Sequence, residues 1–191
     1  MSFVSISFQS RNLHLIDIYL EGGNIVPDTG EVLINGTSVI HHPTTARLAL
    51  GVCPQFTAID SQLTVREHLM IYGRLKGLRR GGELERNAES LMRATTLDIY
   101  ADRLASKLSG GNQRKLSLAI ALIGELPAGL LANVISSVLT FHFPGNPSVV
   151  LIDEFSTGID AKMKRDMWVT LRHVAVGKAV VITTRELFEH G

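Results

Sequence analysis

The chain has 191 residues and one cysteine, Cys53, so it cannot form a disulfide bond within itself. Disulfides are typical of secreted proteins, and their absence favours a reducing compartment such as the cytosol. The opening stretch, MSFVSISFQSRNLHLIDIYL, has neither a basic start nor a continuous apolar run. It lacks the pattern of a secretory signal, and we expect no secretion.

An excess of charge of either sign is also missing. The chain has 19 lysines and arginines against 18 aspartates and glutamates, which leaves a formal net charge of +1. This balance creates no field that would draw the chain to nucleic acid, so we expect no nucleic-acid partner. The seven histidines have no zinc-ligand spacing, and we expect ordinary surface or core residues there.

No hydrophobic run is long enough for a convincing transmembrane helix. The most apolar stretch, LPAGLLANVISSVLTFHF at residues 126–143, is interrupted by Pro127, Asn133 and His142. It also falls short of the roughly 20 apolar residues that a spanning helix needs. With 45% hydrophobic residues, the chain still has enough apolar side chains for the core of one domain.

Turn and strand patterns stand out in the first third of the chain. Asn35 and Gly36 lie between two β-rich runs, which predicts a hairpin with a type I′ turn over residues 31–40. The stretch LALGVCPQF predicts a short buried strand that ends at Pro54. Gln55 would then lie just beyond the end of this strand.

Between residues 62 and 107 the apolar residues recur at helical spacing. Thr64 and Glu67 have the spacing of a capping box, which predicts the start of a helix. These helices form a segment of their own. The first is expected to bury Val65, Leu69, Tyr72 and Leu75, and the second Leu84, Ala88, Leu91 and Met92.

Two apolar runs near the C-terminus predict parallel strands. VVLIDE, at residues 149–154, has the pattern of a buried central strand, and KAVVITT, at residues 178–184, is a second such run. The residues between them predict a crossover helix with Met163, Met167 and Leu171 on one face. A strand, a helix and a strand in this order indicate a parallel α/β core.

The stretch KLSGGNQRK, at residues 107–115, has the pattern of an anion-binding helix start. Ser109 is a natural N-cap, and Gly110 and Gly111 would let backbone N–H groups come close to a ligand. On its own, such a start is more often a plain cap than a phosphate site.

Asp153 and Glu154 close the VVLIDE strand. An acid at this position can hold Mg²⁺ through water, and its neighbour can orient or deprotonate an attacking water. Adjacent residues of a strand point to opposite sides, so the two roles should differ. The alternative is a solvated loop start without such a role.

Together these motifs resemble those of the ATP-binding cassette ATPases, the nucleotide-binding domains of ABC transporters. LSGGNQRK is similar to the family signature, VVLIDE to the Walker B strand, STGID to the D-loop, and Gln55 in CPQF to the Q-loop glutamine. CPQFTAID, LTVREHLMIYGRLKGL and GNQRKLSLAIALIG are most similar to the A subfamily, whose members often handle lipids. The resemblance covers roughly residues 22–124 and 145–184.

The resemblance implies a P-loop NTPase-like α/β fold, with a mixed sheet core, a β-hairpin and a helical subdomain, truncated at its N-terminus. It implies ATP and Mg²⁺ as cofactors, Glu154 as the catalytic residue, and Gln55 and Asp153 as contacts of Mg²⁺. The implied partners are a second nucleotide-binding domain, paired head to tail, and transmembrane domains that hold the chain at the cytoplasmic side of a membrane. The residues implied to contact ATP are Gln55, Ser109, Gly110, Gly111, Gln113, Asp153 and Asp160.

One family motif is missing. No Gly-x-x-x-x-Gly-Lys-Ser/Thr loop occurs in the 191 residues, and RNLHLIDIYLE stands where the family has it. Without this cradle the β- and γ-phosphates lose most of their contacts, so we expect weak or no ATP binding by the chain's own site. Arg185 also replaces the switch histidine, and Phe155 replaces a proline. A guanidinium donates but cannot accept a proton at neutral pH, so Arg185 cannot reproduce the contacts of imidazole.

Three interpretations follow from this mixture of intact and missing motifs. The chain is an ATPase domain that supplies its signature to a partner's ATP, or a catalytically silent module that regulates a partner. The third interpretation is that the chain does not fold alone, because losing the first strands exposes an edge of the sheet.

We interpret the chain as one partial domain with α/β core pieces at residues 22–61 and 145–184. A helical subdomain with the signature helix spans residues 62–124, and an atypical insertion spans residues 125–145. Deleting the insertion joins LSLAIALIG to NPSVVLIDE as the family has them.

The genetic code allows this insertion to be a retained intron. GGTGAG can encode Gly124-Glu125, GCTAAC can encode Ala132-Asn133, and a pyrimidine tract ending in CAGG can encode the end of the insertion. A genuine surface loop is the alternative. We expect the transcript to lack these codons; codons incompatible with the splice signals would exclude the intron.

Overall fold

The computed structural model describes residues 33–55, 58–79, 81–124, 147–153, 160–174 and 178–183. The expected insertion at residues 125–145 and the expected catalytic residue Glu154 lie outside these ranges. Phe155 and Arg185 also lie outside them.

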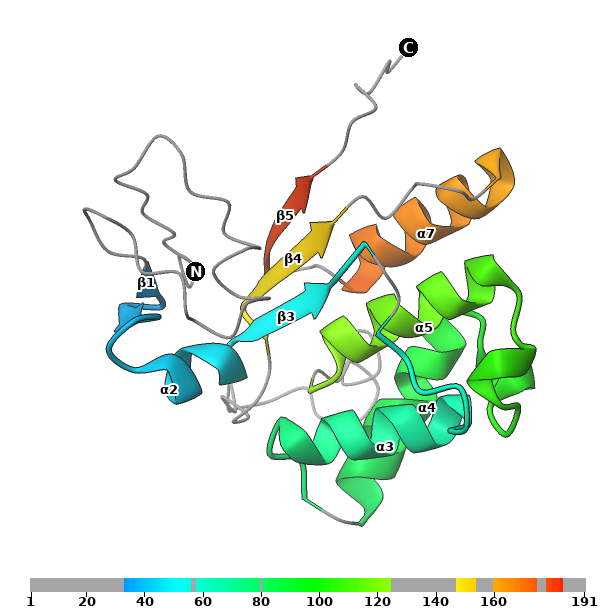
Figure 1. The fold of residues 1–191 in the computed structure, drawn as a ribbon, viewed down its shortest axis with the longest axis horizontal. Helices are drawn as coiled ribbons and strands as arrows, with labels where there is room; N and C mark the ends of the chain where they lie inside the picture. The colour runs from blue at the N-terminus through cyan, green and yellow to red at the C-terminus, as the bar shows by residue number, and fades with distance from the viewer. Residues whose placement is uncertain are drawn as a thin grey trace, which may run out of the picture.

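A parallel sheet of three strands forms the centre of the described structure (Figure 1). Its strands are β3 (Leu50–Cys53), β4 (Val149–Asp153) and β5 (Ala179–Thr183), in the order β3-β4-β5. The central strand β4 is buried along its apolar residues, as its uninterrupted run of apolar side chains predicts. The predicted parallel α/β core is therefore confirmed.

The predicted hairpin is present, with β1 (Leu33–Ile34) paired antiparallel to β2 (Thr37–Ser38). Asn35 has φ 50° and Gly36 has φ 74°, as a type I′ turn requires. A short helix that the sequence patterns did not predict, α2 (Pro43–Leu48), follows the hairpin. Its first-turn proline fits a helix start, but it has no apolar stripe that would have identified it.

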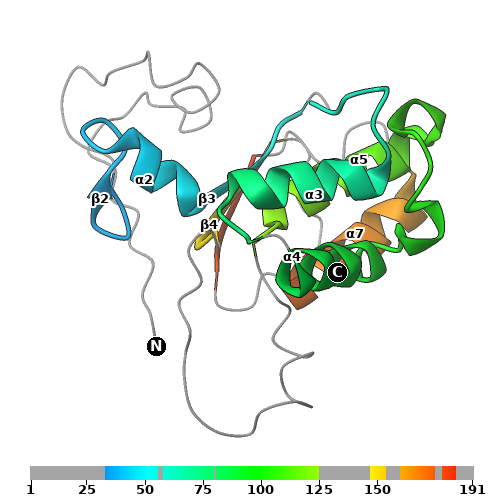
Figure 2. The same ribbon diagram turned by 90° about the horizontal axis from the view of Figure 1, so that it is seen from below.

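Four longer helices lie to one side of the strands, opposite the hairpin and α2 (Figures 1 and 2). The four helices are α3 (Val65–Leu75), α4 (Gly82–Ala94), α5 (Gly110–Leu122) and α7 (Ala161–Val174). Two short 3₁₀ turns, η1 (Asp98–Tyr100) and η2 (Ala105–Lys107), join α4 to α5.

The predicted buried faces are confirmed for α4, whose four predicted residues are all buried, and only partly for α3. Val65 and Leu69 are buried, but Leu75 is 70% exposed, so the prediction for Leu75 was wrong. At about 100° per residue, Leu75 lies about 120° away from the buried Leu69 and about 160° away from Gly73 around the helix. The core-facing position near this end of α3 is Gly73, where an added Cβ would lie 2.5 Å from Leu84 Cδ1.

Helix α5 approaches strand β3 so closely that only glycine fits at one position of the strand. A Cβ built on Gly51 would lie 2.0 Å from the backbone oxygen of Ala121. Because this neighbour is backbone, it cannot swing aside as a flexible side chain could. The same contact buries Cys53 completely, and the Cys53 thiol donates to Ser117 Oγ of α5 at 3.5 Å.

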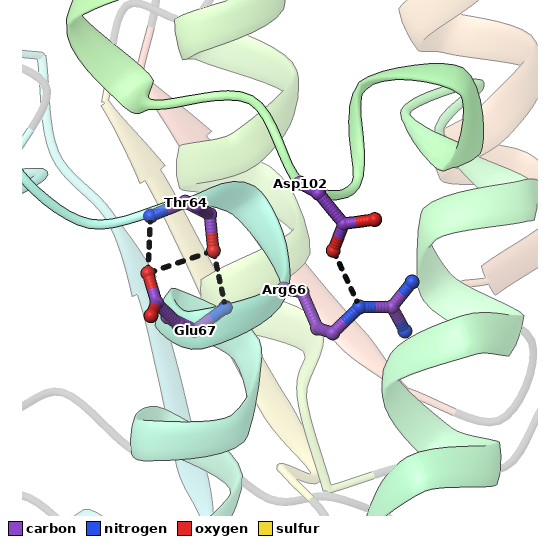
Figure 3. A network of polar contacts seen from close by, with 4 residues as sticks. All are labelled: Thr64, Arg66, Glu67 and Asp102. Atoms are coloured by element: carbon purple, nitrogen blue, oxygen red, sulfur yellow. Dashed lines mark hydrogen bonds and ion pairs between the residues drawn. The ribbon is translucent and has the colours of Figure 1, made fainter.

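The start of α3 is capped as the sequence predicts (Figure 3). Thr64 Oγ1 accepts the backbone N–H of Glu67 at 3.2 Å, and Glu67 Oε2 accepts the backbone N–H of Thr64 at 2.8 Å. These hydrogen bonds, first that from the Thr64 backbone, hold the pKa of Glu67 below its usual value. The cap therefore fixes where α3 begins.

The same helix start is joined to the segment that precedes α5. The backbone N–H groups of Val65 and Arg66 donate to the carbonyls of Arg103 and Ala101, at 3.2 and 2.9 Å. Arg66 Nε also lies 3.0 Å from Asp102 Oδ1 (Figure 3), but both side chains are exposed, so this ion pair adds less than about 1 kcal/mol. The backbone hydrogen bonds therefore do most of the joining.

We expect Thr64→Ala to lower the free energy of unfolding by about 1 kcal/mol near neutral pH, because the α3 cap loses its acceptor. The loss should shrink as the pH falls through the lowered pKa of Glu67 in the folded chain. The hydrogen bond from Thr64 Oγ1 to the Glu67 carboxylate favours the ionised form, so its contribution to stability is lost when Glu67 is protonated. Urea unfolding at several pH values measures both effects. Thr64→Ser is the matched control, and equal stability of the alanine and serine variants would contradict the cap's role.

Candidate functional site

The carboxyl ends of β3 and β4 bring two of the predicted site residues to one edge of the sheet. Cys53 is in register with Ile152 of the neighbouring strand, so Gln55 and Asp153 both follow at the same end. This edge is where open α/β sheets hold their ligands. Oxygen atoms of carboxylates and amides suit Mg²⁺, so the chemistry of this pair fits the ion.

A buried arginine from α5 reaches this edge. Arg114 is 9% exposed, and its Nη1 donates to the backbone oxygen of Pro54 at 2.7 Å. Burial raises the pKa of the nearby Cys53 thiol, while the Ser117 hydrogen bond and the Arg114 charge act in the opposite direction. The Asp153 charge raises it further, so Arg114 and Asp153 both lie close enough to act on the same thiol.

The predicted anion-binding helix start is formed at the other end of α5. Ser109 caps the helix, and its side-chain oxygen accepts the backbone N–H of Asn112 at 3.3 Å. A Cβ added to Gly110 would meet nothing within 4 Å, whereas one added to Gly111 would lie 2.8 Å from Met163 Cε. Gly110 is therefore open on its outer side, and Gly111 packs against α7.

Two other predicted ATP contacts make structural hydrogen bonds. Asp160 Oδ1 accepts the backbone N–H of Met163 at 2.9 Å, at the start of α7, and this bond lowers the pKa of Asp160. Gln113 Nε2 donates to the backbone oxygen of Ala105 at 3.0 Å. Since Met163 also contacts Gly111, Asp160 and the helix start lie in one cluster. The roles of Asp160 and Gln113 toward ATP stay predictions.

His68, expected to be an ordinary surface or core residue, is buried and has a structural function. Its Nε2 accepts the backbone N–H of Asp60 at 2.9 Å, which assigns the ring proton to Nδ1. Nδ1 then donates to the backbone oxygen of Thr64 at 2.7 Å. The loop after Gln55 is thereby fastened to the first turn of α3.

A cavity of about 230 Å³ lies between β3, α3 and α5, close to Gln55. Its lining is mostly apolar, but it includes Lys76, whose ammonium donates to the backbone oxygens of Leu50 and, at 3.2 Å, Arg47. Burial lowers the pKa of Lys76 to about 8, and the charge of Lys178 acts in the same direction. Sequence patterns gave no signal for this lysine, because nothing in its spacing separates it from surface lysines.

Comparison with known proteins identifies the family. The sequence model described as "ABC transporter" matches residues 20–131, which is more than half of the chain. The chain belongs to the ABC transporter family. It is an ATP-binding domain of the A subfamily.

The cassette is 38% identical over 168 residues to "Retinal-specific phospholipid-transporting ATPase ABCA4" of Bos taurus. It is 35% identical to "Phospholipid-transporting ATPase ABCA7" of Homo sapiens and 33% identical to "ABC transporter A family member 10" of Arabidopsis thaliana. Each match covers 87% of the cassette, but only 6%, 7% and 16% of those relatives, respectively.

Solved structures confirm the predicted fold class. "Structure of ATP binding subunit of ABC transporter" matches with a TM-score of 0.65 at 23% identity, over 88% of the cassette and 62% of that chain. "Structure of a bacterial Atm1-family ABC exporter with ATP bound" matches with a TM-score of 0.62 at 23% identity, over 89% of the cassette and 27% of that chain.

In the part of the cassette that the structure describes, no helix is long and apolar enough to cross a membrane. The same residues contain no group of three or more histidine, cysteine, aspartate or glutamate side chains placed to hold a metal ion.

We expect the wild-type cassette to gain stability relative to Lys76→Met as the pH rises from 8 toward 10.5. Lys76 releases its proton near pH 8 in the folded chain but near 10.5 when unfolded, so the unfolded chain binds more protons between these values. Below pH 8, Lys76 is charged in both the folded and the unfolded chain, so the whole free-energy cost of burying its charge is present there. Urea unfolding, followed by the fluorescence of the single tryptophan Trp168, measures the trend.

The control for this prediction is Lys107→Met, the same change at an exposed lysine. Its stability should follow the wild type across the pH range. Parallel curves for wild type and Lys76→Met would show that Lys76 does not titrate in this range.

Proposed function

We propose that the cassette is half of a composite ATP site in a lipid-handling ABC transporter of the A subfamily. In this arrangement the helix start at Ser109, Gly110 and Gly111 covers an ATP molecule held by a second cassette, paired head to tail. The names of two relatives support lipid as the cargo, since both are called phospholipid-transporting ATPases.

The observation that carries this proposal is the open face of Gly110. Nothing lies within 4 Å of a Cβ placed there, while Gly111 is backed by Met163 of α7. The start of α5 therefore packs against α7 at Gly111, while Gly110 leaves space for a ligand. The unpaired N–H groups and the positive end of the helix dipole at this start favour an anion such as a phosphate.

The cassette's own nucleotide site would lie at the carboxyl ends of β3 and β4, and we propose that it binds ATP only weakly. Gln55 and Asp153 lie together at the strand ends and have the oxygen ligands that Mg²⁺ prefers, and Glu154 follows as the candidate general base. Bound there with ATP, Mg²⁺ would neutralise phosphate charge. We infer weak ATP binding at this edge, because the 191 residues contain no phosphate loop with its lysine.

Transmembrane domains are the partner that we propose for the cavity beside Gln55, which would place the cassette at the cytoplasmic side of a membrane. The cavity opens between β3, α3 and α5 and is mostly apolar, which suits an apolar side chain of a docked helix. The Lys76 ammonium at its lining adds a preference for a segment that also carries a carboxylate.

A catalytically silent module is the second candidate. The missing phosphate loop favours it, since a cassette that holds no nucleotide can still regulate a partner. The two candidates differ in one respect: only the half-site cassette increases the turnover of a partner that binds ATP.

We expect ATP hydrolysis in a mixture of this cassette with a complete partner cassette to exceed that of the partner alone. The cassette alone should hydrolyse no ATP. Turnover by the isolated cassette would contradict the weak site that we infer. A mixture no faster than the partner alone would favour the silent module or a chain that does not fold alone.

Gly110→Asp tests the helix start within the same assay. The new carboxylate favours the first turn of α5 but repels phosphate, so the fold is kept while stimulated turnover falls by roughly a hundredfold. Gly82→Asp makes the same change in the first turn of α4, away from the site, and should leave stimulation intact. Equal stimulation by both variants would show that the α5 start does not meet the phosphate.

A further inference from the structure

The loop that carries Gln55 is fastened to the helices at both of its ends. At the near end, Arg114 Nη1 of α5 donates to the carbonyl of Pro54, the residue directly before Gln55. At the far end, His68 of α3 accepts the N–H of Asp60. The loop therefore follows the helices at these two points, in addition to its connection to β3.

The near-end contact is well suited to transmit a small displacement. Arg114 is 9% exposed, so the hydrogen bond at 2.7 Å is shielded from water and made by a charged donor. Breaking it would leave a buried guanidinium without this acceptor, which is costly. The link therefore favours movement of the two elements together over separation.

The position of Arg114 along α5 connects this link to the signature. Gly110 lies at the start of the helix, and Arg114 follows one turn later on a rigid element. The rest of α5 packs on β3 at Gly51 and Ala121, so the helix cannot slide without disturbing the strand. A displacement of the helix start would therefore also displace the Pro54 carbonyl, through the Arg114 hydrogen bond.

We propose that Arg114 is a positioning residue that couples the signature at the start of α5 to the Gln55 loop. When the signature is held on a partner's ATP, α5 is fixed, and Arg114 fixes Pro54 and Gln55 with it. The inference rests on the proposed half-site function. It adds that occupancy of the partner's nucleotide is reported to this cassette's own Gln55 through the Arg114 side chain.

Lys115 provides a matched comparison on the same helix. It is 8% exposed, and its Nζ donates to Thr96 Oγ1 at 2.6 Å, just beyond the end of α4. Lys115 is therefore a buried cation of similar exposure that links α5 to the helices and not to the Gln55 loop. Lys115→Met removes a comparable interaction without touching the proposed connection.

The single cysteine reports on the link directly. Cys53 immediately precedes Pro54, is completely buried, and is the only thiol in the chain. A thiol reagent reaches it only when this segment opens, so the labelling rate measures opening. The experiment mixes the cassette with a complete partner cassette that has no cysteine and cannot hydrolyse ATP, and compares labelling with and without ATP.

We expect ATP to slow Cys53 labelling in the wild type and in Lys115→Met, and to leave it unchanged in Arg114→Met. Basal labelling of Arg114→Met should rise roughly tenfold or more relative to Lys115→Met, because the charged hydrogen bond lost in Arg114→Met is the one that holds Pro54, next to Cys53. Arg114→Lys, which keeps a donor, should restore part of the ATP response. A purely structural role would move basal labelling but not the response to ATP.

Two results would overturn the link. One is an ATP response in Arg114→Met equal to that of the wild type, and the other is a wild-type cassette that co-elutes with its partner in ATP but labels at an unchanged rate. Failure to co-elute at all would overturn the half-site function itself, and the link with it. Size-exclusion chromatography in ATP separates these cases.

Discussion

The contact between the backbones of α5 and β3 is the constraint on which the rest of the site depends. The Ala121 carbonyl of α5 lies so close to Gly51 of β3 that no side chain would fit at position 51. This approach buries Cys53 against Ser117 and brings Arg114 within reach of the Pro54 carbonyl. The helix that begins at the signature is thereby held at a fixed distance from the strand that leads to Gln55.

Around this contact the predicted site residues fall into two groups. Gln55 and Asp153 lie at the strand ends, while Gly111 and Asp160 both lie against Met163, with Ser109 and Gly110 directly before Gly111 in the chain. Helix α5 connects the two groups, with Arg114 at the Pro54 end of the connection. Such a division fits a cassette in which one group serves its own nucleotide edge and the other serves a partner's.

Local rules of turns, caps and strands predicted much of this arrangement from sequence. The Asn35-Gly36 turn, the Thr64 capping box and the buried strand β4 each depend on neighbouring residues alone, and each was predicted. Helix α2 was missed because it has a proline start but no apolar stripe. The family resemblance, and not spacing, supplied the roles of the site residues.

The interactions that depend on tertiary packing could not be predicted. Arg114 and Lys115 are adjacent cations, and no sequence rule says that one reaches Pro54 while the other reaches Thr96. Successive residues differ by about 100° around a helix, so adjacent side chains meet different neighbours. The buried setting of Lys76 likewise follows from where α3 ends against β3, which depends on the whole fold.

The central claim is that the cassette completes a nucleotide site held by another domain. Its most direct test is the amount of ATP bound by a purified pair of this cassette with a complete, hydrolysis-deficient cassette, determined by equilibrium dialysis at saturating ATP. We predict one tightly bound ATP per pair, bound more tightly than by the complete cassette alone, and only weak binding by this cassette alone. Tight ATP binding by the isolated cassette, or a pair that binds ATP no more tightly than the complete cassette, would contradict it.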